Sequence, residues 1–206
     1  MFDLDDTLHN ASAHIFPHLN RSMTEYLMEH LAMEQTEADD LRRHYWHIYG
    51  ATLKGLMRHH GTNPHHFLHH THQFPDLQNM IIRARGLRSI LRQLKGRKVI
   101  FTNAPVIYAE AVLKLLRIRD LFDGVFSIES SRFNPKPSLI GFMRMLRYFR
   151  LRADDCVMVE DTLSALQTAK RLGMKTVHIH PRAKQPPYVD ACIRSVLALP
   201  RIAVAL

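Results

Sequence analysis

The second half of this chain alternates short β-type runs with helical patterns, and this alternation restricts the fold more than any other feature. The β-type runs are apolar and rich in Val, Ile and Phe, whereas the segments between them carry apolar residues three and four positions apart. Strands that alternate with helices favour a parallel sheet with right-handed crossovers. We predict strands over 98–101, 124–127, 156–159 and 175–179, and helices over 87–94, 106–118, 138–149 and 162–172.

The stretch from about Ala11 to Arg85 contains no strand-like run. Its patterns predict helices over 17–31 and 52–60, a helix capped by Thr36, and a further helix opened by Asn63-Pro64. A helical segment between the first and second strands of an α/β sheet is typical of an insertion above the carboxyl ends of the strands. We therefore predict an α/β, Rossmann-like core formed by residues 1–10 and 86–206, with an all-helical cap over residues 11–85.

Paired carboxylates stand at the start of the chain, in Asp3-Leu4-Asp5-Asp6-Thr7. Asp3 and Asp5 are two positions apart, so on a strand they share one face and converge where the strand ends. Such a pair suits a divalent, oxygen-seeking cation, with one acid free to attack and the other to move a proton. The bland alternative is that these residues only form a turn.

Further polar residues fall at the ends of later predicted strands. Lys136 adds a cation, in a loop stiffened by flanking prolines, Asn134-Pro135-Lys136-Pro137. Carboxylates, a hydroxyl, an amide and one cation at a single sheet edge match phosphoryl transfer by positioning and electrostatics. The strand-end residues are Thr102, Asn103, Glu160 and Asp161.

In their order, DLDDT, then TN, then a lysine between prolines, then VED, these motifs resemble the haloacid dehalogenase superfamily of phosphohydrolases, over nearly the whole chain. The resemblance implies that Asp3 is the nucleophile that becomes an aspartyl-phosphate. Asp5 would be the general acid, which later activates water. Thr102 and Lys136 would hold the transferring phosphoryl group.

The same resemblance implies a magnesium site. Asp3, the backbone carbonyl of Asp5, and the acids Glu160 and Asp161 would form it, with Asp161 as the expected direct ligand of the two. The helical insertion between the first two motifs corresponds to the C1 class of cap. The stretch between Asn103 and Lys136 is too short to hold an insertion at the alternative point. Asn103 is as well suited to holding a turn as to contacting a ligand, and Asp161 also suits capping the following helix.

A finer resemblance is to pyrimidine 5′-nucleotidases, carried by DLDDTLHNASAHIFP, by YGATLKGLMRHHG at 49–61 and by RFNPKPS at 132–138. It implies hydrolysis of pyrimidine nucleoside monophosphates, with His9, Asn10, Tyr49 and Lys54 lining the pocket for the base. Two alternatives stay open: a phosphatase for another small metabolite such as phosphoglycolate or a sugar phosphate, and a catalytically silent binding module. Members of this family usually carry several apolar residues before the first motif, so we expect the natural start upstream of Met1 or a truncated form.

Composition narrows the partners. The formal net charge of +9 attracts anions, but the basic residues are scattered along helices, which makes specific nucleic-acid binding an unfavoured interpretation. A field that favours anionic substrates is a better interpretation, and a merely solvated basic surface is the favoured one. Cys156 and Cys192 show neither metal-site spacing nor a disulfide framework. With no apolar run long enough to cross a bilayer and no signal pattern, we expect a cytoplasmic protein. The oligomeric state is left open.

Histidines crowd one part of the predicted cap, between His59 and His72. The pairs His65/His69 and His66/His70 have the i, i+4 spacing that can hold a transition metal. No carboxylate or cysteine accompanies them in a recognised pattern, so a solvated helical face is the favoured interpretation and a metal site the alternative.

Overall fold

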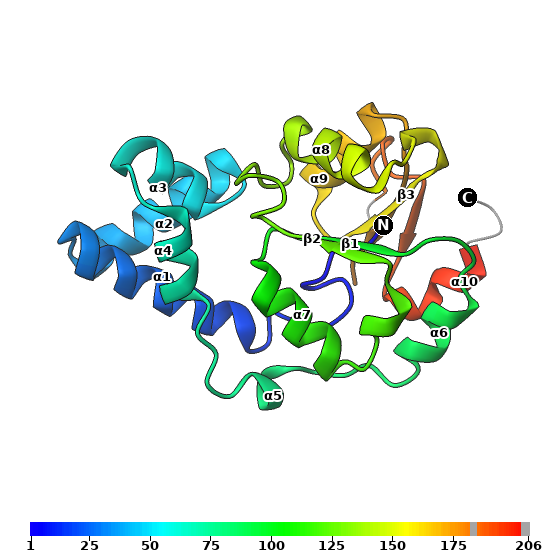
Figure 1. The fold of residues 1–206 in the computed structure, drawn as a ribbon, viewed down its shortest axis with the longest axis horizontal. Helices are drawn as coiled ribbons and strands as arrows, with labels where there is room; N and C mark the ends of the chain where they lie inside the picture. The colour runs from blue at the N-terminus through cyan, green and yellow to red at the C-terminus, as the bar shows by residue number, and fades with distance from the viewer. Residues whose placement is uncertain (182–184, 203–206) are drawn as a thin grey trace.

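The computed structural model describes residues 1–181 and 185–202, and shows an α/β protein in which four helices project from one end of a parallel sheet (Figure 1). The strands are β1 (Val99–Phe101), β2 (Gly124–Phe126), β3 (Val157–Glu160), β4 (Lys175–Ile179) and β5 (Ala191–Ile193). The α-helices are α1 (Ile15–Leu31), α2 (Gln35–Tyr49), α3 (Thr52–His60), α4 (Pro64–Thr71), α5 (Leu77–Met80), α6 (Leu87–Gln93), α7 (Val106–Leu115), α8 (Leu139–Phe149), α9 (Leu163–Arg171) and α10 (Leu199–Ile202). None of the helices in the described ranges is long and apolar enough to span a membrane.

The start of the chain lies in the middle of the sheet. β1 pairs with β2, and β3 pairs with β4 and β4 with β5, all in parallel. Phe2 forms parallel bridges to Ile100 on one side and Val159 on the other, so it joins the two groups of strands. The Phe2 backbone N–H donates to the Val99 carbonyl at 2.9 Å and the Asp3 N–H to that of Val159 at 3.0 Å. The spatial order is therefore β2, β1, Phe2, β3, β4, β5, and Asp3 leaves the sheet at its centre.

The predicted fold class is confirmed, and the four strands predicted in the second half are present with shifts of a residue or two at their ends. β5 was not predicted, because Ala191–Ile193 is short and its pattern is weak. The predicted cap at Thr36 was wrong. The N-cap of α2 lies two residues earlier, at Glu34, whose backbone is extended, and the helix starts at Gln35. Asn63 is confirmed as an N-cap, since its side-chain oxygen accepts hydrogen bonds from the backbone N–H groups of His65 and His66.

Helices cover both faces of the sheet. On one face α8 and α9 pack over Phe101, Phe126 and Met158. On the other face α6, α7 and α10 pack over Phe2 and Ile100. Because side chains alternate along a strand, these parallel strands are apolar on both faces, as the continuous apolar runs require.

Helices α1–α4, residues 15–71, form a separate helical block beside the sheet (Figure 1). The helical block has its own apolar core, which includes Tyr26, Leu27 and Phe67 and also takes in Ile128 from the loop after β2. Its turn at Gly50 lies against the loop that carries Lys136: a Cβ built on Gly50 would lie 2.7 Å from the Lys136 carbonyl oxygen. The helical block thus contacts the loop that carries Lys136, one of the predicted catalytic residues.

Candidate active site

Three carboxylates and one lysine meet at the carboxyl ends of the central strands. Asp3 follows the Phe2 bridge and Glu160 ends β3. The Lys136 Nζ, also buried, donates to Asp3 Oδ1 at 2.6 Å and to Glu160 Oε2 at 2.5 Å. One oxygen from each of Asp3, Glu160 and Asp161 lies within 4.8 Å of the others. Residues far apart in the sequence thus form one buried ionic group, as expected for residues at the carboxyl ends of parallel strands.

Charge in this group is unbalanced. Burial and repulsion from Glu160 raise the pKa of Asp3 to about 8, although Lys136 opposes the shift. Burial, and then repulsion from Glu160 and Asp3, raise the pKa of Asp161 to about 9. Burial would also raise the pKa of Glu160, but the charge of Lys136 and hydrogen bonds from the Asp161 side chain, Lys136 and the Thr162 N–H outweigh it and lower that pKa. One ammonium therefore serves three acids, and two of them hold their protons more tightly than a free aspartate does.

This imbalance matches a site for a divalent cation. Carboxylate oxygens are the ligands that Mg²⁺ prefers, and an added cation would lower the pKa of the acids around it. The two Glu160 oxygens are already engaged, Oε2 by Lys136 and Oε1 by the backbone N–H groups of Asp161 and Thr162. Asp161 accepts a single long hydrogen bond, 3.4 Å from the Thr7 hydroxyl, among the described residues. Its carboxylate is the freer of the two.

Asp5 is held by two side chains from different elements. The Tyr108 hydroxyl, in α7, donates to Asp5 Oδ1 at 2.6 Å, and His9 Nε2 lies 2.9 Å from the same oxygen. Because an ionised carboxylate only accepts, this geometry assigns the proton of a neutral His9 to Nε2. His9 Nδ1 is buried with no partner in the described chain, as fits a nitrogen without a proton. Both donors go to Oδ1, which leaves Oδ2 of Asp5 available.

The residues after β1 divide into two roles. Thr102 is buried, and its Oγ1 accepts a hydrogen bond of 3.0 Å from the Ala104 N–H, which leaves the hydroxyl proton free to donate elsewhere. The Asn103 side chain instead holds the backbone of Lys136. Its Oδ1 accepts from the Lys136 N–H at 2.7 Å and its Nδ2 donates to the Lys136 carbonyl at 3.0 Å. Asn103 thus positions the lysine loop.

The four residues predicted to line the base pocket are held by different partners in two parts of the structure. His9 is buried against Asp5, and exposed Asn10 accepts a hydrogen bond from the Ala13 N–H just before α1. Tyr49, at the end of α2, pairs through its hydroxyl with His59 Nε2 at 2.7 Å. Lys54 Nζ, in α3, lies 3.4 Å from Asn134 Oδ1 in the lysine loop. Tyr49 and Lys54 therefore belong to the part of the helical block that borders this loop, whereas His9 and Asn10 belong to the first motif.

Two contacts of the site were not predicted from sequence. Tyr108 lies inside a helix with nothing in its local pattern to set it apart from a core aromatic residue. His178, in β4, is buried and its Nε2 bonds the Asp161 carbonyl at 3.0 Å. A polar residue near the end of a predicted strand is the signal that could have identified His178.

Comparison with known proteins agrees with this geometry. Residues 1–179 match the family model described as haloacid dehalogenase-like hydrolase. The chain belongs to this family. Among solved structures, CbbY from Rhodobacter sphaeroides in complex with phosphate superposes with a TM-score of 0.70, at 18% identity, over 100% of this chain and 97% of that one. At that identity the likeness concerns the fold alone.

Two curated proteins are also similar. Phosphate metabolism protein 8 of Saccharomyces cerevisiae is 29% identical over 134 residues, which cover 60% of this chain and 41% of that protein. Sesquiterpene phosphatase astK of Aspergillus oryzae is 31% identical over 98 residues, which cover 45% of this chain and 48% of that protein. The matched segments span less than half the length of each relative.

Proposed function

We propose that this protein is a Mg²⁺-dependent phosphomonoesterase that works through an aspartyl-phosphate on Asp3. The observation that carries the proposal is the convergence of Asp3, Lys136, Glu160 and Asp161 at the sheet centre, with Asp5 beside them. The family membership and the names of both curated relatives support phosphate chemistry.

Asp3 has the geometry of a positioned nucleophile. Its Oδ1 is fixed by Lys136, while Oδ2 accepts no hydrogen bond from the described residues. We propose that Oδ2 attacks the phosphorus of the substrate, so that an O–P bond forms as the bond to the leaving oxygen breaks. The Lys136 ammonium holds the nucleophile in place and offsets the charge that develops on the phosphoryl oxygens.

Asp5 is the residue that moves the proton. In the first step its protonated form gives a proton to the leaving oxygen, and in the second its carboxylate takes a proton from the water that attacks the aspartyl-phosphate. Tyr108 and His9 hold Oδ1, so the exchanged proton resides on Oδ2. Water attack at phosphorus releases inorganic phosphate and returns Asp3 to its carboxylate form.

The remaining residues bind and orient. Thr102 donates its free hydroxyl proton to a phosphoryl oxygen, and Asn103 keeps Lys136 in place. Asp3, Asp161 and the Asp5 backbone carbonyl would hold Mg²⁺, with Glu160 orienting Lys136 and the chain after β3. When bound there, the ion neutralises phosphoryl charge and favours the ionised form of Asp3.

For the substrate, we propose a pyrimidine nucleoside monophosphate whose base is recognised by a cap of residues 11–85, which contains the helical block. The support is the sequence resemblance, together with the contact of the helical block with the lysine loop at Gly50 and Lys54. Tyr49 and Lys54 are the residues we propose to contact the base. A phosphatase for another small metabolite is the second candidate, because one curated relative is a sesquiterpene phosphatase.

A hydrolysis panel tests the proposal. Phosphate release is measured from UMP, CMP, dTMP, AMP and phosphoglycolate, with Mg²⁺ and with EDTA. We expect Mg²⁺-dependent release, highest from UMP and CMP. Preference for phosphoglycolate would reject the nucleotide proposal and keep the phosphatase. Folded protein that releases no phosphate from any of these substrates would reject the phosphatase proposal for this panel and favour a binding module.

A further inference from the structure

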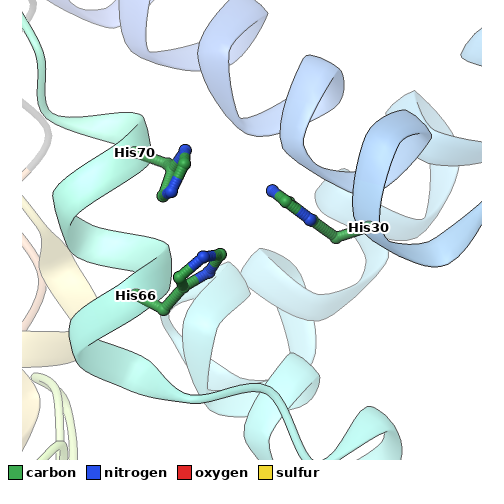
Figure 2. A group of neighbouring side chains, drawn as sticks. All are labelled: His30, His66 and His70. Carbon is green, nitrogen blue, oxygen red and sulfur yellow. The ribbon is translucent and has the colours of Figure 1, made fainter.

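We propose that His30, His66 and His70 form a site for a first-row divalent transition metal, Zn²⁺ in particular, on the surface of the helical block. One ring nitrogen of each histidine lies within 4.8 Å of those of the others. Figure 2 shows the three imidazoles turned toward one another, with His66 and His70 on α4 and His30 at the end of α1. The i, i+4 spacing of His66 and His70 is compatible with a metal site. The third histidine, from another helix, favours a metal site over the interpretation of a merely solvated helical face.

The three imidazoles match a zinc ligand set. Zn²⁺ binds neutral imidazole nitrogens at about 2.0–2.1 Å, which in a tetrahedron sets ligand nitrogens about 3.3 Å apart. All three side chains are exposed, so small rotations can close the remaining gap without disturbing the apolar core. The ring centroids are already 4.3 Å apart for His66 and His70 and 5.0 Å for His30 and His66. Three protein ligands leave a fourth position for water or another donor.

Groups around the cluster favour metal binding. The Tyr26 hydroxyl lies 2.9 Å from His66 Nδ1, a contact that orients the ring and leaves Nε2 for a metal. The Glu29 carboxylate lies 3.9 Å from His30 Nε2 and brings negative charge to the cluster.

The consequence of binding would be a cross-link between α1 and α4. Within the helical block these helices pack through Tyr26 and Phe67. A metal that joins His30 to His66 and His70 stabilises the folded arrangement, and the stabilisation grows with the logarithm of its affinity, because the unfolded chain does not hold the three ligands together. The site is distinct from the carboxylate group at the sheet centre in position and in ligand chemistry.

Zinc titration of the full-length chain tests the proposal. Binding of Zn²⁺, without substrate, is measured by calorimetry. Mg²⁺ is present in large excess so that it occupies the carboxylate site of Asp3 and Asp161. We expect one Zn²⁺ per chain and a higher thermal midpoint. The double variant His66→Ala/His70→Ala should weaken binding at least tenfold and abolish the thermal shift. An unchanged affinity in this variant would overturn the proposal.

Two further variants separate this site from general chelation by a histidine-rich surface. His65→Ala/His69→Ala removes two exposed histidines with the same spacing on the same helix, neither of them in the cluster, and should keep wild-type affinity. Equal loss in both double variants would overturn the proposal. His30→Ala should weaken binding about tenfold, and wild-type affinity there would reduce the site to an i, i+4 pair and reject the three-ligand assignment. Because all five side chains are exposed, each variant should fold, and circular dichroism checks this.

Discussion

Among the described residues, two groups of side chains could hold a metal ion, and they are built in opposite ways. The group of Asp3, Glu160 and Asp161 lies at the ends of strands, is largely buried and is neutralised in part by Lys136. The group of His30, His66 and His70 lies on two helices and is exposed. The first is rigid and costly to assemble, since burying charge is unfavourable without partners. The second costs little and is held in place only by the packing of α1 against α4.

This difference sets what each group can do. Hard carboxylate oxygens in a buried, preorganised site suit Mg²⁺ and phosphoryl transfer, whereas exposed imidazoles suit a softer ion and a structural role. Substitutions in the buried group should therefore affect turnover and stability together. Substitutions in the exposed group should change zinc binding and leave phosphate release without zinc within about twofold of wild type.

The largest expected effect is at Asp3, the proposed nucleophile. Asp3→Asn keeps the shape of the side chain but removes the attacking charge, so kcat should fall at least about a thousandfold. Phosphate release from the best substrate of the panel measures it. Asp6→Asn is the matched control: Asp6 belongs to the same motif, but its carboxylate accepts hydrogen bonds from Ser12 and we expect activity within a few-fold of wild type. Activity of Asp3→Asn within tenfold of wild type would reject Asp3 as the nucleophile.

Next comes the lysine that holds the buried acids together. Lys136→Met leaves Asp3 and Glu160 side by side without their cation, and should lower the free energy of unfolding by about 3 kcal/mol. Lys170→Met is the control. Lys170 pairs with Asp190 at 2.5 Å in a half-buried position, and its loss should cost less than about 1 kcal/mol. Urea unfolding of both variants makes the comparison, and equal losses would show that burial of the Lys136 group adds nothing.

Much of the buried group could be predicted from sequence, and the reason is topological. Parallel strands bring their carboxyl ends to one edge, so the residues after Phe2, Phe101 and Val159 had to meet there once the strands were recognised. His30 and His66 could not be connected in this way. Their contact depends on how α1 crosses α4, and helix periodicity does not determine a crossing angle. The contact of Tyr108 with Asp5 could not be predicted for the same reason, because it depends on where α7 packs.

The turn at Gly50, where the helical block meets the lysine loop, should show an effect on stability comparable to that of Lys136→Met. Gly50 and Gly61 both have left-handed backbone conformations, with φ of 76° and 63°, but only Gly50 faces the lysine loop. Gly61→Ala should cost about 1 kcal/mol from backbone strain alone. Gly50→Ala adds a clash with the Lys136 carbonyl and should cost about 3 kcal/mol, with a loss of activity that Gly61→Ala does not share. Similar costs would mean that the helical block yields readily at this contact.

The smallest expected effect is a pH dependence at the base of the helical block. Burial lowers the pKa of His72 to about 4 from its ordinary value of 6.5, although the Asp5 charge opposes the shift. Below pH 6.5 the unfolded chain binds a proton at His72 that the folded chain refuses until about pH 4. Stability is therefore present above pH 6.5 and is lost as the pH falls toward 4. The full shift corresponds to about 3 kcal/mol, and because the side chain of His72 is only partly buried, solvent screening should reduce the loss to about 1–2 kcal/mol.

His72→Gln should flatten this part of the stability curve. Denaturant unfolding at several pH values between 7 and 4 measures the slope, and the same substitution at exposed His47 controls for the change of side chain. A slope that is unchanged in His72→Gln would show that other groups produce the acid sensitivity.

The double hydrogen bond from Asn103 to Lys136 has a consequence for how the protein meets its ligand. One amide engages both the N–H and the carbonyl of the lysine backbone, so the loops after β1 and before α8 behave as a single piece. The relative positions of Thr102 and Lys136 are then fixed before any phosphate binds. The two loops therefore lose little conformational entropy on binding. A ligand that needs these groups further apart must break an amide pair first. In this way the Asn103 side chain fixes the spacing between Thr102 and Lys136.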